Sequence, residues 1–389
     1  MSLLFAGFNG IRIFISLGVI ALVVQALWFY PLKEMFQRFF HEPVMWSISC
    51  VFFILVLSGL NSENHAAWLV WLRMAVAFLA MPLAFSAFPS FEELWFLKVL
   101  KVFVVVMSIS ALAVLIHYGL HYETINKQIE MGSTIPVPFS HIRYNLLLVF
   151  ASCCAFFLYE KRNDKKLWLA LSVFLFAAIH FLASRSGWLA LYSCILVRLV
   201  LYVMQTKKWK QALVVLLVLL LVPAGAYFVS DGLQAKVNYM RYDWNEFVAG
   251  RIEGRSDAMR LASWKTGVAL VKENFWFGTG AGDIAQESDR MGGQLFPSLS
   301  AESRKMPHNE FLWMWAATGI FGLLTFCFAF LFPFVLIMKR GEWPGIALFL
   351  IFFTSFLSEY PLHEQVGSIF YLAFLLLFVN RYVWLKSVQ

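Results

Sequence analysis

The stretch from Glu310 to Met338 reads EFLWMWAATGIFGLLTFCFAFLFPFVLIM, and its only charged residue is the first one. A membrane-spanning helix needs about 20 mostly apolar residues, so this stretch is long enough to cross a bilayer. The whole chain follows the same pattern, because 61% of its 389 residues are apolar and only 14% are charged. A soluble domain carries about 25% charged residues and could not bury so much apolar side chain. The composition therefore excludes a soluble enzyme, a nucleic-acid-binding domain and a disordered chain.

Eleven apolar runs of sufficient length predict membrane spans. They lie near 11–30, 45–61, 66–89, 96–118, 143–160, 166–183, 187–204, 211–229, 310–338, 343–359 and 366–385. A short helix near the N-terminus would bring the number to twelve. We therefore expect an all-α polytopic membrane protein with about 11–12 transmembrane helices. Spans 1–8 occupy residues 1–229, one large loop subdomain occupies 230–307, and spans 9–11 occupy 308–389.

The lysine and arginine residues predict the orientation of these spans. Most of them gather in alternate short loops, with clusters at 161–166, 207–210 and 339–340. Loops rich in Lys and Arg face the cytoplasm, so the remaining loops face outward. The outer side then carries the only large hydrophilic segment, residues 230–307.

The outer segment is too long for an unstructured connection and is expected to fold. A helix is predicted from Asp257 to Phe275, because apolar residues recur there every three or four positions. The predicted buried face consists of Leu261, Trp264, Val268, Val271 and Phe275.

Several arginines of the outer segment stand where positive charge is normally sparse. Arg251, Arg255 and Arg260 are the most central of them. A solvated surface would explain such charge, and a site for an anionic ligand would explain it equally well. Arginine suits phosphate because its planar guanidinium donates two parallel hydrogen bonds and stays protonated.

Arg185 lies in the tight turn LASRSG between spans 6 and 7, at the outer membrane face. A charge at this depth costs on the order of 3 kcal/mol, so such residues usually have a partner or a function. The alternative is an arginine whose side chain reaches the lipid headgroups.

His308 opens the sequence PHNEF where the outer segment re-enters the membrane. Its imidazole could accept a proton near neutral pH, although a histidine at such a position often serves only as a capping or interfacial residue. Asn309 follows it directly. Gly319 and Gly322, further along the same helix, would let a neighbouring helix or a lipid chain pack closely. Glu359, in a short outer turn, could position a basic or hydroxyl partner.

Neither a metal nor a cofactor is expected. His117 and His121 have helical i, i+4 spacing, but no third ligand is evident. The glycine-rich stretch 278–282 follows a helix and not a strand, which argues against a nucleotide-binding loop. The five cysteines lie inside apolar runs and are interpreted as core residues.

The sequence resembles a known family at several of these positions. His308-Asn309, with Gly319 and Gly322 downstream, is similar to the outer-loop signature of bacterial O-antigen ligases. The layout of spans, the Arg185 turn and the large outer segment resemble the wider superfamily, which includes O-antigen polymerases and bacterial protein O-glycosyltransferases.

Arg260, with Trp264 four residues later, falls where that family has an essential loop arginine. The family more often has leucine at the later position, so Arg255 remains a competing candidate for the same role.

The resemblance implies a GT-C-like membrane enzyme in the bacterial inner membrane, with its active site facing the periplasm. Its members transfer a glycan from undecaprenyl pyrophosphate to an acceptor hydroxyl, which is lipid A–core in the ligases. The ligases are metal-independent and inverting. The partners implied here are therefore the lipid-linked glycan donor, the hydroxyl acceptor and membrane lipid, without nucleic acid.

The resemblance also suggests roles for the residues. Arg185 and Arg260 would stabilise the charge of the pyrophosphate leaving group, and His308 would accept the proton of the acceptor hydroxyl. The expected substrate-binding residues are Arg255, Asn309, Arg251 and Glu359. An O-antigen polymerase, a protein O-glycosyltransferase and, from another class, a transporter of lipid-linked oligosaccharides remain the alternatives.

Overall fold

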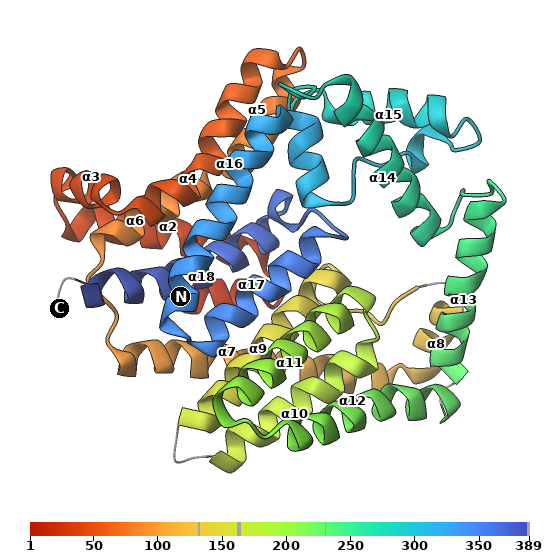
Figure 1. Ribbon diagram of the computed structural model, residues 1–389, viewed down its shortest axis with the longest axis horizontal. Coiled ribbons are helices and arrows are strands. Elements are labelled where there is room, and N and C mark those ends of the chain that lie inside the picture. The colour runs from red at the N-terminus through yellow and green to blue at the C-terminus, as the bar shows by residue number, and fades with distance from the viewer. Residues whose placement is uncertain (131–132, 162–164, 230, 387–389) are drawn as a thin grey trace.

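The computed structural model describes residues 1–130, 133–161, 165–229 and 231–386, and every regular element in these ranges is a helix (Figure 1). The predicted all-α class is confirmed. Eight helical stretches are long and apolar enough to cross a membrane. They are α2 (Arg12–Phe29), α4 with the 3₁₀-helix η1 (Pro43–Asn61), α5 and α6 (His65–Ala87), α7 (Glu93–Leu120), α9 (His141–Lys161), α10 (Lys165–Leu182), α11 (Arg185–Thr206) and α16 (Glu310–Arg340).

Three shorter apolar helical stretches fall on the other predicted spans. They lie in α12 (Trp209–Val229), α17 (Trp343–Phe356) and α18 (Gln365–Lys386). Each of the eleven predicted spans therefore corresponds to a helix. The short helix at the N-terminus is α1 (Ser2–Gly7), whose six residues are too few to cross a bilayer.

The remaining helices lie outside the predicted spans. They are α3 (Leu32–His41), α8 (Tyr122–Glu130), α13 (Asp231–Val248), α14 (Ser256–Glu273), α15 (Ile284–Leu295) and the 3₁₀-helices η2 (Ala301–Ser303) and η3 (Pro361–His363). The large outer segment is thus helical, as expected, and contributes α13, α14 and α15.

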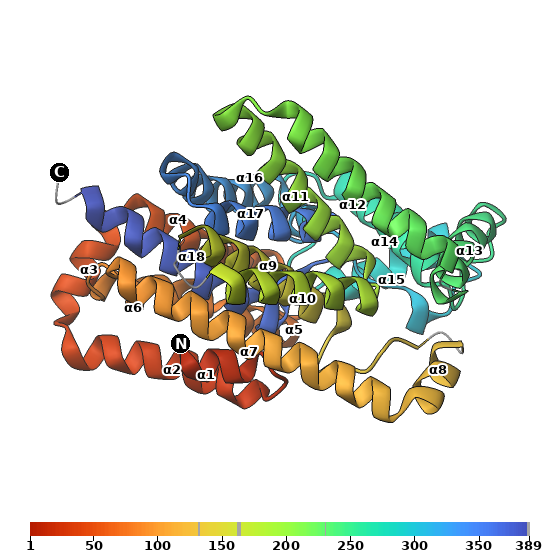
Figure 2. The same cartoon turned by 90° about the horizontal axis from the view of Figure 1, so that it is seen from below.

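The centre of the membrane part is built around α9, which is buried along most of its length, with α7, α10, α11 and α17 packed against it (Figure 2). Phe103, Phe150 and Phe374 form an aromatic cluster there, with ring centroids 4.6 to 5.6 Å apart. These side chains come from α7, α9 and α18. The core therefore joins early and late parts of the chain and fixes the outer ends of these helices relative to one another.

The helix predicted at Asp257–Phe275 is present as α14, but its predicted buried face is only partly right. Val271 is buried, whereas Val268 is 46% exposed and Phe275 lies beyond the end of the helix, 39% exposed. Most of the other buried residues are small, namely Ala258, Ala262, Ser263, Thr266 and Gly267. They allow close packing on more than one side, because Ala258 and Ala262 cluster with Ile252 and Leu299, and a Cβ atom at Gly267 would lie 2.6 Å from the side chain of Leu312. A spacing rule that counts only large apolar residues cannot detect such a face.

Helix α16 is broken at Gly319, where φ is +70° and ψ is −174°. The segment Phe275–Gly280 lies against the break and bonds to the backbone groups around it. Thr279 N donates to Ala316 O at 2.8 Å, and Ile320 N donates to Phe275 O at 2.9 Å. Gly319 was expected to admit a helix or a lipid chain; the structure places this loop there instead.

Replacement of Gly319 by alanine should strongly destabilise the protein. A Cβ atom at this position would lie 2.1 Å from the carbonyl oxygen of Trp276, and a φ of +70° with a ψ of −174° is nearly restricted to glycine, which adds about 1–3 kcal/mol of strain. Gly341→Ala is a control for the positive φ alone, because Gly341 has a φ of +69° in the left-handed helical region, with nothing within 4 Å. Thermal unfolding in detergent should show a much larger loss for Gly319→Ala. Equal losses would contradict the role assigned to the loop contact.

Candidate active site

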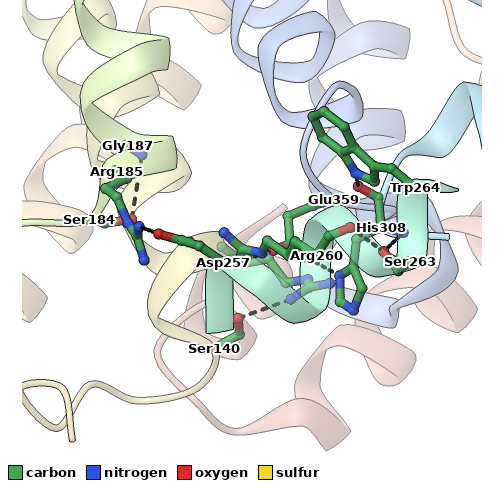
Figure 3. A network of polar contacts seen from close by, with 11 residues as sticks. Ser140, Ser184, Arg185, Gly187, Asp257, Arg260, Ser263, Trp264, His308 and Glu359 are labelled. Carbon is green, nitrogen blue, oxygen red and sulfur yellow. Dashed lines mark hydrogen bonds and ion pairs between the residues drawn. The ribbon is translucent and has the colours of Figure 1, made fainter. Parts of the chain in front are cut away.

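Arg185 stands at the outer end of α11 and pairs with a carboxylate of the outer segment. Ser184 caps this helix through Gly187 N, and Arg185 is its first residue. Its guanidinium forms an ion pair with Asp257, in the first turn of α14 (Figure 3). A turn between two membrane spans is thereby tied to the start of α14.

Glu359 contacts both Arg260 and His308, the other two residues for which a catalytic role is expected. One of its carboxylate oxygens pairs with Arg260, on α14. The other lies 3.5 Å from Nδ1 of His308. The Glu359 side chain is only 6% exposed, so this contact takes place away from bulk water. Three residues that are distant in sequence thus meet at the outer face (Figure 3).

The backbone of His308 is held by α14. Its N–H donates to Ser263 Oγ at 3.2 Å, and its carbonyl accepts from Trp264 Nε1 at 2.7 Å. Trp264 is the residue at which the family more often has leucine, and here it has a structural role of its own. The ring of His308 therefore stays at the end of α16 while its Nδ1 faces Glu359.

Asn309 contributes through the backbone. Its Oδ1 accepts from Leu312 N at 2.9 Å and caps α16, while its Nδ2 donates to Leu357 O at 3.0 Å. Both ends of the amide are used in this way. Asn309 thereby connects the start of α16 to the segment that carries Glu359, and its contact with substrate stays a prediction.

The charge of Glu359 is stabilised by its surroundings. Burial raises the pKa of this carboxyl group, but the hydrogen bond from His308 and the positive charges of Arg260 and Arg143 lower it by more. The pKa of Glu359 therefore lies below the ordinary value, and the carboxylate is ionised at neutral pH. A carboxylate on Nδ1 favours the proton on that nitrogen and leaves Nε2 as the proton acceptor.

Arg143 is a member of the cluster that the sequence reasoning missed. It lies in the first turn of α9, is 7% exposed, and pairs with Glu364 at 3.0 Å. Its Nη1 donates to Ser140 Oγ at 3.0 Å, and its charge acts on Glu359. In the sequence it stands at the first position of the predicted span near 143–160. An arginine at the outer end of a span, at bilayer depth, was the signal that could have identified it.

Arg251 and Arg255 are bound elsewhere. Both pair with Glu246 of α13, and the Arg255 guanidinium also lies 4.6 Å from the centre of the Tyr242 ring. Of the two competing loop arginines, Arg260 is thus the one that shares a partner with His308.

A second buried pair lies behind His308. His363 Nδ1 lies 3.0 Å from Glu310 Oε1, and the two side chains are 7% and 1% exposed. The other oxygen of Glu310 accepts from Leu362 N at 3.2 Å, and the ring of Trp313 packs on His363 with centroids 3.7 Å apart. The pair connects the start of α16 to η3, just after Glu359 in the chain.

Loss of His363 should therefore be costly. His363→Leu leaves Oε1 of the buried Glu310 without its side-chain partner, and an unpaired buried polar group typically costs about 1–3 kcal/mol. Thermal unfolding should show this loss and a partial recovery in the double variant Glu310→Gln/His363→Leu. His65→Leu, at an exposed histidine, is the control and should have little effect. A His363→Leu variant as stable as the control would show that the pair does not hold the two segments together.

Metal ligation finds no support among the side chains described. Within residues 1–130, 133–161, 165–229 and 231–386, no group of three or more His, Cys, Asp or Glu residues could hold a metal ion. The rings of His117 and His121 lie 4.4 Å apart, and His121 Nδ1 contacts the carbonyl oxygen of His117.

Residues 170–327, less than half of the chain, match the model of a family described as O-antigen ligase. This part of the chain is therefore similar to the O-antigen ligase family. The matched region contains Arg185, Arg260 and His308, whereas Arg143 and Glu359 lie outside it. No curated protein matches the chain.

Proposed function

We propose that the protein transfers a glycan from undecaprenyl pyrophosphate to an acceptor hydroxyl on the periplasmic face of the bacterial inner membrane, as an O-antigen ligase does. The proposed acceptor is the hydroxyl of lipid A–core. The observation that carries the proposal is the bridge through Glu359. It sets a base candidate, His308, beside a phosphate-binding candidate, Arg260, at the outer end of the membrane helices.

The chemistry of such a transfer requires two groups that act together. His308 Nε2 takes the proton of the acceptor hydroxyl as the hydroxyl oxygen attacks the anomeric carbon of the donor sugar. The bond from that carbon to the pyrophosphate oxygen breaks, and its electron pair leaves with undecaprenyl pyrophosphate. Attack from the side opposite the leaving group inverts the anomeric centre, and no metal is required in this scheme.

Arginines would stabilise the negative charge that develops on the leaving group. Arg260 lies on α14 and is paired with Glu359, and Arg185 is paired with Asp257 of the same helix. A pyrophosphate is a bidentate acceptor of higher charge and would replace Asp257 on Arg185, while Glu359 would keep its contact with His308. The carboxylates would thus keep the arginines in place until the donor binds.

The placement of the site is consistent with this substrate. Arg185 begins α11 and His308 directly precedes the cap of α16, at helix ends that the positive-inside rule directs outward, and Arg260 of α14 is paired with Glu359 beside His308. A polyprenyl chain would remain in the lipid while its pyrophosphate reached this boundary.

The His308→Ala variant should abolish ligation. Removal of a general base lowers the rate by about 10²–10⁴-fold, because the hydroxyl proton has no positioned acceptor. The measurement is lipopolysaccharide gel electrophoresis of cells that express each variant at matched membrane levels, with His65→Ala as control. Ligase activity predicts loss of all O-antigen-bearing bands, including the single-repeat band, whereas a polymerase defect would remove only the long ladder. Full ligation by His308→Ala would exclude the base assignment.

Arg260 and Arg255 should differ in their effect on turnover. Loss of a donor that stabilises transition-state charge costs about 10²–10³-fold in rate, so Arg260→Ala should lose that much. Arg255→Ala should lose no more than a few fold, because Arg255 pairs with Glu246 of α13 and not with the carboxylate that contacts His308. The test is transfer by purified protein supplied with a lipid-pyrophosphate glycan and candidate acceptors. A larger loss of transfer in Arg255→Ala than in Arg260→Ala would assign phosphate binding to Arg255.

The stability contributed by Glu359 should depend on pH. Since the pKa of this group is lowered from the ordinary 4.5, its charge stabilises the folded protein above that pH. This contribution is lost as the pH falls below 4.5 through the lower value of the folded state. The melting temperature of the unsubstituted protein should exceed that of Glu359→Gln by a constant amount at neutral pH, and the difference should shrink in acid. Glu63→Gln, at an exposed carboxyl group, is the control. No difference at pH 7 would contradict the bridge.

A further inference from the structure

A cavity lies at the end of the molecule opposite the candidate active site. It is a groove of about 910 Å³, lined by α3, the start of α4, the end of α6 and Asn380 of α18. Asn380 lies 16 residues after Glu364, which is about 24 Å along a helix at 1.5 Å per residue. The groove is therefore separate from the site around Arg260 and His308, and Figure 1 shows α3 at the far end of the fold from α14.

Helix α3 has the features of a helix that lies in the membrane interface. Its ten residues are too few to cross a bilayer. Met35 and Phe39 are buried against the protein, whereas Leu32, Phe36 and Phe40 are 56%, 46% and 67% exposed. The three exposed residues follow one another at four-residue spacing and form an apolar stripe. Such amphipathic helices lie in the interface with the apolar stripe directed toward the acyl chains.

The groove combines this apolar stripe with charges of both signs. Phe36 and Phe40 line it together with Met45 and Phe85, which provides a surface for acyl chains. A polar row runs beside them at the same spacing, formed by Lys33, Gln37 and His41. Arg38 and Glu42 complete the lining, so two cationic side chains and one carboxylate face the same space.

We propose that this groove binds one phospholipid of the phosphatidylethanolamine class, in the leaflet opposite the candidate active site. The lipid phosphate would lie against Lys33 and Arg38, and its primary ammonium against Glu42. This headgroup matches the lining because it too carries both charges. The volume lies in the range of ordinary ligand sites, 300–1,000 Å³, and accommodates the headgroup, the glycerol and the upper part of the chains.

Lys33 is the best residue with which to test the phosphate contact. Arg38 already donates to Ala87 O at 3.3 Å and lies 3.7 Å from Glu34, so its replacement would also disturb protein contacts. Lys33 is exposed on α3. Lys98, on α7, is a matched control, because it is also exposed, belongs to the same set of basic residues by the positive-inside pattern, and does not line the groove.

The experiment is native mass spectrometry of the delipidated full chain with dioleoyl lipids of equal chain length. Phosphatidylethanolamine should bind at one copy per protein, several fold more tightly than phosphatidylcholine, whose methylated ammonium cannot donate a hydrogen bond to Glu42. Lys33→Gln should weaken binding at least threefold, Glu42→Gln should remove the preference over phosphatidylcholine, and Lys98→Gln should change neither. Melting temperatures confirm that each variant is folded.

Several results would overturn the proposal. Equal binding of the two lipids by the unsubstituted protein would show that the groove does not recognise the headgroup. An unchanged affinity in Lys33→Gln would show the same for the phosphate contact. Tighter binding of phosphatidylglycerol than of phosphatidylethanolamine would identify an anionic lipid and contradict the role of Glu42. None of these outcomes bears on the transfer reaction, since the groove and the candidate active site are tested separately.

Discussion

A single buried carboxylate organises the outer face of this protein. Glu359 lies in a short turn after α17, yet it contacts an arginine of the outer segment and the histidine that opens α16. A buried carboxylate without partners would be expensive, so the three residues depend on one another. Because each lies on a different element, the pairing also fixes the position of α14 over the ends of α16 and α17.

Other features of the fold support this contact. The break at Gly319 receives the loop that follows α14, which anchors the C-terminal end of that helix to α16. Asp257 anchors its N-terminal end to α11 through Arg185. Between these two anchors, Ser263 and Trp264 bond to the backbone of His308. The outer segment is therefore attached to the membrane helices along the whole length of α14, and Arg260, in the second turn of that helix, pairs with the carboxylate that contacts His308.

The sequence predicted the membrane helices well, because long apolar runs carry a strong signal that depends only on the bilayer. It also singled out Arg185, Arg260 and His308, partly from their position and partly through a family resemblance. The sequence failed to predict contacts that depend on a partner distant along the chain. The buried face of α14 was only partly predicted, because much of it consists of small residues that pack against Ile252, Leu299 and α16. Arg143 was missed because its partner Glu364 cannot be identified from the sequence, and the backbone contacts of Asn309 were not predicted.

The central claim is that the arginines at this face, which now bind carboxylates, form the cradle for a lipid pyrophosphate. An experimental structure of the protein with bound undecaprenyl pyrophosphate tests it most directly. The account predicts phosphate oxygens at about 3 Å from the guanidinium groups of Arg185 and Arg260, with Asp257 released from Arg185 and His308 still beside Glu359. A pyrophosphate bound elsewhere, with the Arg185–Asp257 and Arg260–Glu359 pairs intact, would contradict it.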